Sequence, residues 1–166
     1  MANTYTLIEA KTLGSAVASV TFSSIPQTYT DLQILISGRS ARSGILDDLY
    51  LNFNSSTANF AGIILYTDNG SSAGSFSSGR SNGFLTGNSA TSNTFSNMSV
   101  YIANYTSSNF KPISSDGVGE NNATAVGMAL TANLWSNTAA ITSINLSFGS
   151  FDFMTNSTLY LYGIKN

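Results

Sequence analysis

Short runs in which apolar and polar residues alternate are the feature of this 166-residue chain that most restricts its fold. In an extended strand, an alternation of period two places every second side chain on the same face, so one face can be buried while the other meets solvent. Four runs follow this pattern and end close to Gly, Asn or Ser: residues 32–36, 49–53, 98–102 and 144–148. Each run predicts a half-buried β-strand.

Less regular segments predict further strands at residues 5–13, 16–22, 111–115 and 159–164. Residues 60–66 are continuously apolar, which is typical of a strand at the centre of a sheet. The alanines of residues 123–135 also allow a short helix, but a strand is favoured. After a turn predicted at Asp68-Asn69-Gly70, the Gly/Ser-rich residues 71–93 predict a long loop with one short strand.

About eight to ten strands are therefore expected, with no room for the crossover helices of a parallel sheet. We predict an all-β, single-domain antiparallel β-sandwich, jelly-roll-like, that spans residues 1–166. The chain contains no cysteine, so packing and hydrogen bonds must hold this fold without disulfides.

Charged residues make up only 8% of the chain, and Lys and Arg total six. Binding to nucleic acid needs clustered cations, so no nucleic-acid partner is expected. A membrane partner is not expected either, because the longest apolar run, residues 61–66, is far too short to span a bilayer. The first residues show no signal peptide, which predicts synthesis in a cytoplasm.

The chain contains no histidine, which removes the usual general base and the commonest transition-metal ligand. A carboxylate pair remains possible among eight acidic residues, but most of them adjoin turns, where Asp is common for local reasons. Asp47-Asp48 and residues 116–122 offer clustered oxygens for Ca²⁺ without a recognised spacing. Gly117-Val118-Gly119 is too short for a dinucleotide motif. We expect no catalytic residue, no cofactor and no metal.

Aromatic residues raise a carbohydrate-binding alternative. Such residues suit the half-buried surface of a strand, so a place in the core or in an interface is favoured over a sugar platform. The platform candidates are Tyr50, Tyr101, Tyr105, Trp135, Tyr160 and Tyr162.

Several segments resemble small virion proteins of tailed bacteriophages, especially those of marine phages and cyanophages. The similar segments are residues 5–8, 18–22, 25–32, 102–105, 111–114, 120–125 and 159–165, so the resemblance covers nearly the whole chain. It implies a jelly-roll-like module in a symmetric oligomer, a homotrimer being expected. It names no catalytic motif.

Two functions follow from the resemblance. The first is a capsid cement, or decoration, protein that binds the major capsid protein on the outer surface of the virion, after synthesis in the host bacterial cytoplasm. The alternative is a tail-fibre or receptor-binding module that recognises host surface glycans. The first is favoured because no shaft segment is visible. The expected interface residues are Thr4, Tyr5, Leu7, Arg39, Arg42, Phe76, Arg80, Phe84 and Tyr105.

Overall fold

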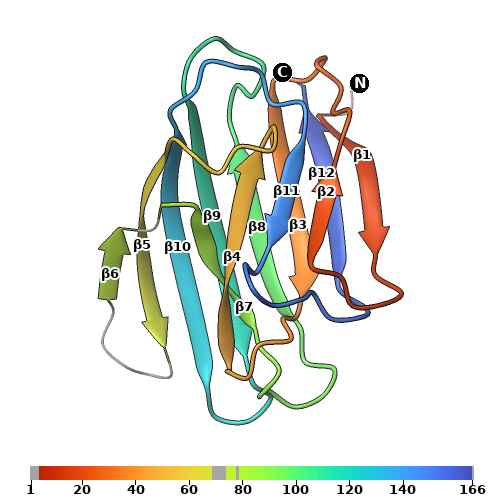
Figure 1. Ribbon diagram of the computed structural model, residues 1–166, viewed down its shortest axis with the longest axis vertical. Helices are drawn as coiled ribbons and strands as arrows, with labels where there is room; N and C mark the ends of the chain where they lie inside the picture. The colour runs from red at the N-terminus through yellow and green to blue at the C-terminus, as the bar shows by residue number, and fades with distance from the viewer. Residues whose placement is uncertain (1–3, 69–73, 78, 166) are drawn as a thin grey trace.

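The computed structural model describes residues 4–68, 74–77 and 79–165, and these residues form two antiparallel β-sheets packed face to face (Figure 1). No described residue lies in a helix, which confirms the all-β sandwich. The described strands number twelve, slightly more than expected.

The larger sheet has eight strands. In spatial order they are β1 (Tyr5–Thr12), β12 (Thr158–Ile164), β3 (Asp31–Gly38), β8 (Ser96–Ile102), β9 (Lys111–Glu120), β10 (Val126–Trp135), β5 (Phe60–Asp68) and β6 (Gly74–Ser77). The smaller sheet has four: β2 (Ser19–Phe22), β11 (Ile144–Ser147), β4 (Leu46–Phe53) and β7 (Ser81–Thr86).

The strand pairing has the jelly-roll pattern. Four antiparallel pairs are nested along the chain, β1 with β12, β2 with β11, β3 with β8 and β4 with β7. This long double ribbon is wrapped so that β12 also pairs with β3, and β11 with β4. Successive nested pairs therefore lie alternately in the larger and the smaller sheet, as in two interlocked Greek keys. The remaining strands, β9, β10, β5 and β6, extend the larger sheet on one side (Figure 1).

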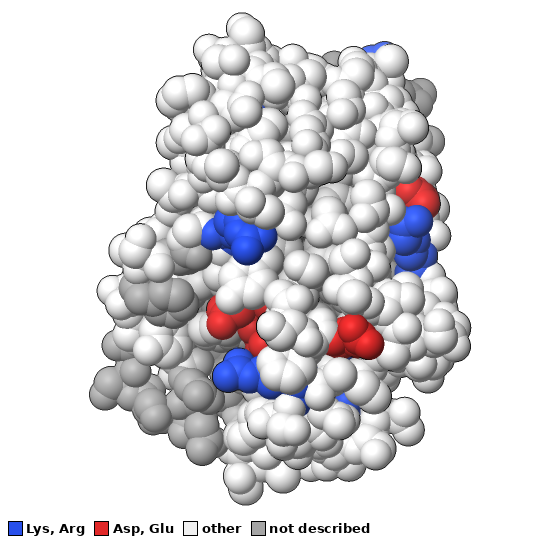
Figure 2. Space-filling view, in the orientation of Figure 1, with Lys and Arg blue, Asp and Glu red and all other residues white. Residues whose placement is uncertain are grey.

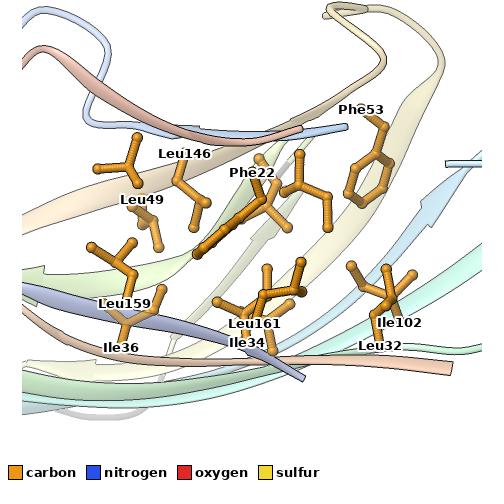
Figure 3. Packing of buried hydrophobic residues seen from close by; sticks show 14 of the residues in the cluster. Phe22, Leu32, Ile34, Ile36, Leu49, Phe53, Ile102, Leu146, Leu159 and Leu161 are labelled. Carbon is orange, nitrogen blue, oxygen red and sulfur yellow. The ribbon is translucent and has the colours of Figure 1, made fainter. Parts of the chain in front are cut away.

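An apolar core fills the space between the sheets. Phe22 of the smaller sheet points toward Ile34 and Leu161 of the larger one, and all three are fully buried (Figure 3). Burial of one such side chain contributes about 1.5–3 kcal/mol. The alternating runs of the sequence are thus explained by one face of each strand meeting this core.

Hydrogen bonds add to the apolar contact of Leu85 beneath β7, which packs on β9 and β10. The Ser115 hydroxyl donates to the Asn82 carbonyl at 2.6 Å, and Asn133 Nδ2 donates to the Ser81 carbonyl at 2.7 Å. Buried polar groups are stable in an interior when they are paired in this way. Since β7 is held by polar partners, its sequence carries no alternating apolar pattern.

Glycines let β4 approach the extension strands closely. A Cβ atom on Gly119 would lie 2.5 Å from a methyl of Leu46, and one on Gly127 would lie 2.6 Å from the other methyl. The Gly117-Val118-Gly119 segment is therefore part of a packed strand, with a role in fitting the two sheets together.

Three expectations are wrong in detail. The strand expected at residues 16–22 covers only Ser19–Phe22. The segment expected to be a loop with one strand contains β6 and β7, because polar partners stabilise β7. The strand at residues 60–66 lies next to the edge strand β6, not at the centre. The turn expected at residues 68–70 includes residues outside the described ranges.

Candidate functional site

The outer side of the eight-stranded sheet is largely apolar, and no described residue forms a layer over it. Among the described residues, twelve large apolar side chains are exposed, and ten of them lie on this side. We call it the open face and define it by these ten: Tyr5, Leu7, Leu35, Ile63, Leu65, Tyr101, Val118, Val126, Met128 and Leu130. Phe110 and Phe151 lie elsewhere.

The strand register explains why these residues share a face. Leu65 pairs with Leu130, and Leu130 with Asp116 on the next strand. The same row continues through Ser99 to Leu35 and then to Tyr160. Because facing residues on adjacent antiparallel strands point to the same side, one continuous row crosses the sheet. The row is apolar toward both ends and polar in the middle.

A shallow hollow of about 390 Å³ lies at this polar centre. Its lining combines Leu35, Ser99, Asp116, Tyr160 and Tyr162, with Asn97 and parts of β3 and β8. The apolar side chains of β10 border the face on one side of Asp116. The hollow thus lies beside the exposed apolar side chains Val126, Met128 and Leu130, which we call the β10 ridge.

A tyrosine–carboxylate bond stiffens one end of the open face. The Tyr101 hydroxyl donates to Oδ2 of Asp31 at 2.6 Å, and the Asn104 amide donates to Oδ1 at 2.7 Å. This hydrogen bond, with burial and the carboxylate charge, raises the pKa of Tyr101 to about 12. The bond ties the end of β8 to the start of β3.

The structure separates the expected interface residues into different places. Thr4, Tyr5 and Leu7 are exposed at or just before the edge strand β1, and Tyr5 and Leu7 belong to the open face. Arg42 and Phe84 line a cavity beside the smaller sheet. Arg80 directly precedes β7, and its guanidinium carbon lies 5.2 Å from the Tyr50 ring. Phe76 belongs to β6, and its side chain falls outside what the structure describes.

Arg39 and Tyr105, both expected in an interface, are buried in the single chain. Arg39 is 4% exposed because its guanidinium donates to carbonyls of the 88–94 loop, among them Thr91 at 2.7 Å and Ala90 at 2.8 Å. Tyr105 is fully buried, and its hydroxyl donates to the Pro26 carbonyl. Both side chains hold loops in place.

The structure also does not assemble the sugar platform expected from the aromatic residues. Tyr105 and Trp135 are fully buried. Tyr101, Tyr160 and Tyr162 point outward from the larger sheet, whereas Tyr50 points outward from the smaller one. These six side chains therefore form no single surface.

Sequence reasoning missed the residues that contribute most to the open face. Ile63 and Leu65 of β5, and Val126, Met128 and Leu130 of β10, are all between 40% and 54% exposed. The only signal in the sequence was that these strands carry apolar residues at odd and at even positions alike. That signal is shared by strands buried on both faces, so it could not distinguish a covered sheet from an open one.

Within residues 4–68, 74–77 and 79–165, no three His, Cys, Asp or Glu side chains are placed to hold a metal ion together. Asp47 instead accepts a 2.5 Å hydrogen bond from the Ser40 hydroxyl, and burial raises the pKa of its carboxyl despite that bond and the nearby Arg42. None of the described segments is a helix with the length and apolar character needed to cross a bilayer.

No protein-family model matches the chain, and no curated protein matches it.

Proposed function

We propose that this protein is a non-catalytic structural subunit that assembles by packing the open face of one copy against a second copy of the chain. The observation that carries the proposal is the concentration of ten of the twelve exposed large apolar side chains on this one face. A patch of that kind on a charge-poor protein favours protein–protein contact.

The size of the open face supports a stable contact. Eight strands spaced about 4.8 Å apart, with outward side chains spread over roughly 25 Å of each strand, give about 1,000 Å². A standard protein–protein interface buries about 800 Å² on each partner. The open face is therefore large enough for a specific contact that uses most of its area.

The charge pattern favours a second copy over a charged partner. The outward positions of β9 carry Asp116 and Glu120, and outward positions on β5 and β10 are apolar or uncharged where described. A face with so little charge has no strong electrostatic complement. It matches another copy of itself in apolar character.

The hollow and the β10 ridge allow either a two-fold dimer or a ring. If the β10 ridge of one copy enters the hollow of the next, each contact uses two different patches of the same face. Where the ridge and the hollow of one copy contact two different neighbours, the contacts are heterologous, and they can close as a ring of three or more subunits. The homotrimer expected from the sequence is the smallest such ring.

We further propose that the assembled subunits act as a cement protein on the outer surface of a phage capsid, where they bind the major capsid protein. The resemblance to virion proteins supports this location. Binding only to an assembled shell would stabilise the shell by mass action, and several weak contacts per oligomer would act together.

The assembly proposal is tested by the molar mass of the purified protein in solution. Light scattering after size-exclusion chromatography should give an oligomer, and the double variant Met128→Glu/Leu130→Glu should be a folded monomer. Phe110→Glu is the matched control, because Phe110 is 51% exposed but lies outside the open face. A wild-type protein that is monomeric at about 100 μM, a concentration at which even weak specific complexes form, contradicts the proposal.

The location is tested separately with phage heads that lack the protein. The purified oligomer should bind them at a fixed stoichiometry and raise the temperature at which they rupture. Heads that bind no protein, or that rupture at the same temperature with it, contradict the cement function without affecting the assembly proposal.

A further inference from the structure

The smaller sheet carries a second surface of a different chemical character. Figure 2 shows that basic and acidic side chains gather over β4 and β7 on this side, while most of the surrounding surface is uncharged. Two hollows of about 410 and 420 Å³ lie there, and Arg42 and Asp48 line both of them. We call the two joined hollows the groove.

Aromatic rings form the walls of the groove. The first hollow is lined by Tyr66 and Phe84, whose rings meet edge to face at 5.8 Å. The second is lined by Tyr50 and by Phe151, which is 39% exposed. Each hollow has a volume typical of small-molecule sites, and apolar walls with a few polar groups are typical of their lining.

The Tyr50 ring is held in place before any ligand arrives. The Arg80 guanidinium carbon lies 5.2 Å from the ring centroid, and Nη1 of Arg80 donates to Oδ1 of Asn52 at 2.5 Å. On the edge of the ring, a Cβ atom on Gly149 would lie only 3.4 Å away. A wall fixed in this way costs little conformational entropy on binding.

A basic and an acidic side chain, Arg42 and Asp48, line both hollows of the groove. Among the described residues, Arg42 donates only from Nη1, at 3.3 Å to the Leu46 carbonyl and 3.4 Å to Asp47. Asp48 accepts a bond from the Ser81 hydroxyl at Oδ1. Nε and Nη2 of Arg42 and Oδ2 of Asp48 are therefore placed to serve a ligand.

The balance of charge restricts the ligand class. Arg42 and Arg80 are offset by Asp47 and Asp48, so an anion meets a carboxylate and a cation meets a guanidinium. A hydroxyl group both donates and accepts, so it can accept from Arg42 and donate to Asp48 at once. Bonds to ionised groups of this kind are stronger than those between neutral groups.

We propose that the groove is a binding site for a neutral saccharide, with hydroxyl groups between Arg42 and Asp48 and C–H faces packed on the aromatic walls. The two adjoining hollows fit a short oligosaccharide better than a single sugar. This site is on the sheet opposite the open face, so an assembled subunit can bind sugar while the open face is covered. The proposal does not depend on assembly.

The test is saturation-transfer NMR of the full chain with four probes: cellotriose, maltotriose, mannotriose and chitotriose. At least one should bind with a dissociation constant of about 1 mM or tighter, as expected for a small open site. Inorganic phosphate and lysine serve as charged probes and should not compete. The absence of binding by every trisaccharide up to about 10 mM, or displacement by a charged probe, overturns the proposal.

Matched variants tie the binding to the groove. Arg42→Gln and Phe151→Ser should each weaken binding of the trisaccharide about tenfold, because each removes a group at the ligand. Lys11→Gln and Phe110→Ser remove a cation and an aromatic ring outside the groove and should leave binding unchanged within about twofold. Equal affinity for the groove variants and the controls, with all four proteins folded, overturns the assignment.

Discussion

Asparagine provides most of the left-handed backbone positions that the turns of this chain need. Of the eight non-glycine residues with positive φ in the described ranges, six are asparagines: Asn54, Asn59, Asn93, Asn104, Asn122 and Asn156. Asparagine tolerates this conformation better than other non-glycine residues, because its short side chain can bond locally. The abundance of Asn thus reflects turn geometry in a protein with many short strands.

Asn156 allows a direct test of this argument, because its side chain is exposed and its φ is 70°. Its backbone amide donates to the Leu13 carbonyl at 2.8 Å and keeps the turn before β12 closed. We expect Asn156→Ala to lower the free energy of unfolding by about 1 kcal/mol, because of backbone strain. Asn156→Gly should change it by less than about 0.5 kcal/mol. Urea unfolding measures both, and equal losses contradict the argument.

Arg39 is the residue on which the loop between β7 and β8 depends. Its two terminal nitrogens donate to the carbonyls of Thr91 and Thr94 and to those of Asn88 and Ala90. Arg39→Met would leave these carbonyls without their donor, and we expect a loss of about 3 kcal/mol of stability. Arg39→Lys should lose less stability, since lysine keeps the positive charge although it lacks the planar guanidinium group.

Hydrogen exchange of the amides in residues 87–95 distinguishes this local role from a general loss of stability. Exchange in this loop should rise more in Arg39→Met than exchange in β3 and β12. Unchanged protection of the loop in a folded Arg39→Met protein contradicts the assigned role.

At the scale of strands, alternation predicted those elements that have the core on one side and polar surroundings on the other. β4 and β11 follow this rule, with Leu49, Leu51 and Leu146 buried and Asn52 and Asn145 outward. Alternation did not predict β7, whose buried side contacts polar partners. β7 is buried along most of its length but holds Ser81 and Asn82 in hydrogen bonds, so its composition resembles that of a loop.

The candidate sites were less predictable than the strands for a related reason. Exposure of Ile63 or Leu65 depends on the absence of a covering layer, which no local pattern encodes. Burial of Arg39 and Tyr105 depends on carbonyls that are distant in the chain, such as that of Pro26. The groove joins Arg42 and Asp48 with Phe151, and only the jelly-roll wrapping brings these segments together.

The bond between Tyr101 and Asp31 links two strands and predicts a dependence of stability on pH. Because the folded state raises the pKa of Tyr101 from 10.0 to about 12, it holds the phenolic proton more tightly than the unfolded chain does. This contribution to stability is fully present below pH 10 and is lost as the pH rises through 12. Tyr101→Phe removes the contribution at every pH.

Urea unfolding between pH 9 and pH 12 tests this link. Burial also raises the pKa of Tyr50 and Tyr105. The wild type and the Tyr101→Phe variant should therefore both lose stability in alkali. The difference between wild type and Tyr101→Phe should therefore be largest below pH 10 and shrink toward pH 12. A difference that stays constant over this range contradicts the bond.

At the scale of the whole molecule, the strands added to the jelly-roll frame create most of the open face. Six of its ten residues come from β5, β9 and β10: Ile63, Leu65, Val118, Val126, Met128 and Leu130. Without these strands, the outer side of the sheet would be only the four strands β1, β12, β3 and β8. The extension therefore supplies an area and an apolar character that the two-sheet fold itself does not require, which is consistent with the proposed use of this face.

Asp116 offers the sharpest test of that use, because it is an exposed carboxylate among the residues lining the hollow of the open face. Covering the face with a second copy would take the ionised carboxylate out of water, which opposes association unless the group is paired. We expect Asp116→Asn to lower the dissociation constant of the oligomer about tenfold, since an amide is less costly to bury. Asp152→Asn, an equal change at an exposed position outside the open face, should have no effect. Sedimentation equilibrium of the three proteins measures the constants. An unchanged constant for Asp116→Asn would mean that the carboxylate stays in water, and the open face would then not be the surface through which the copies associate.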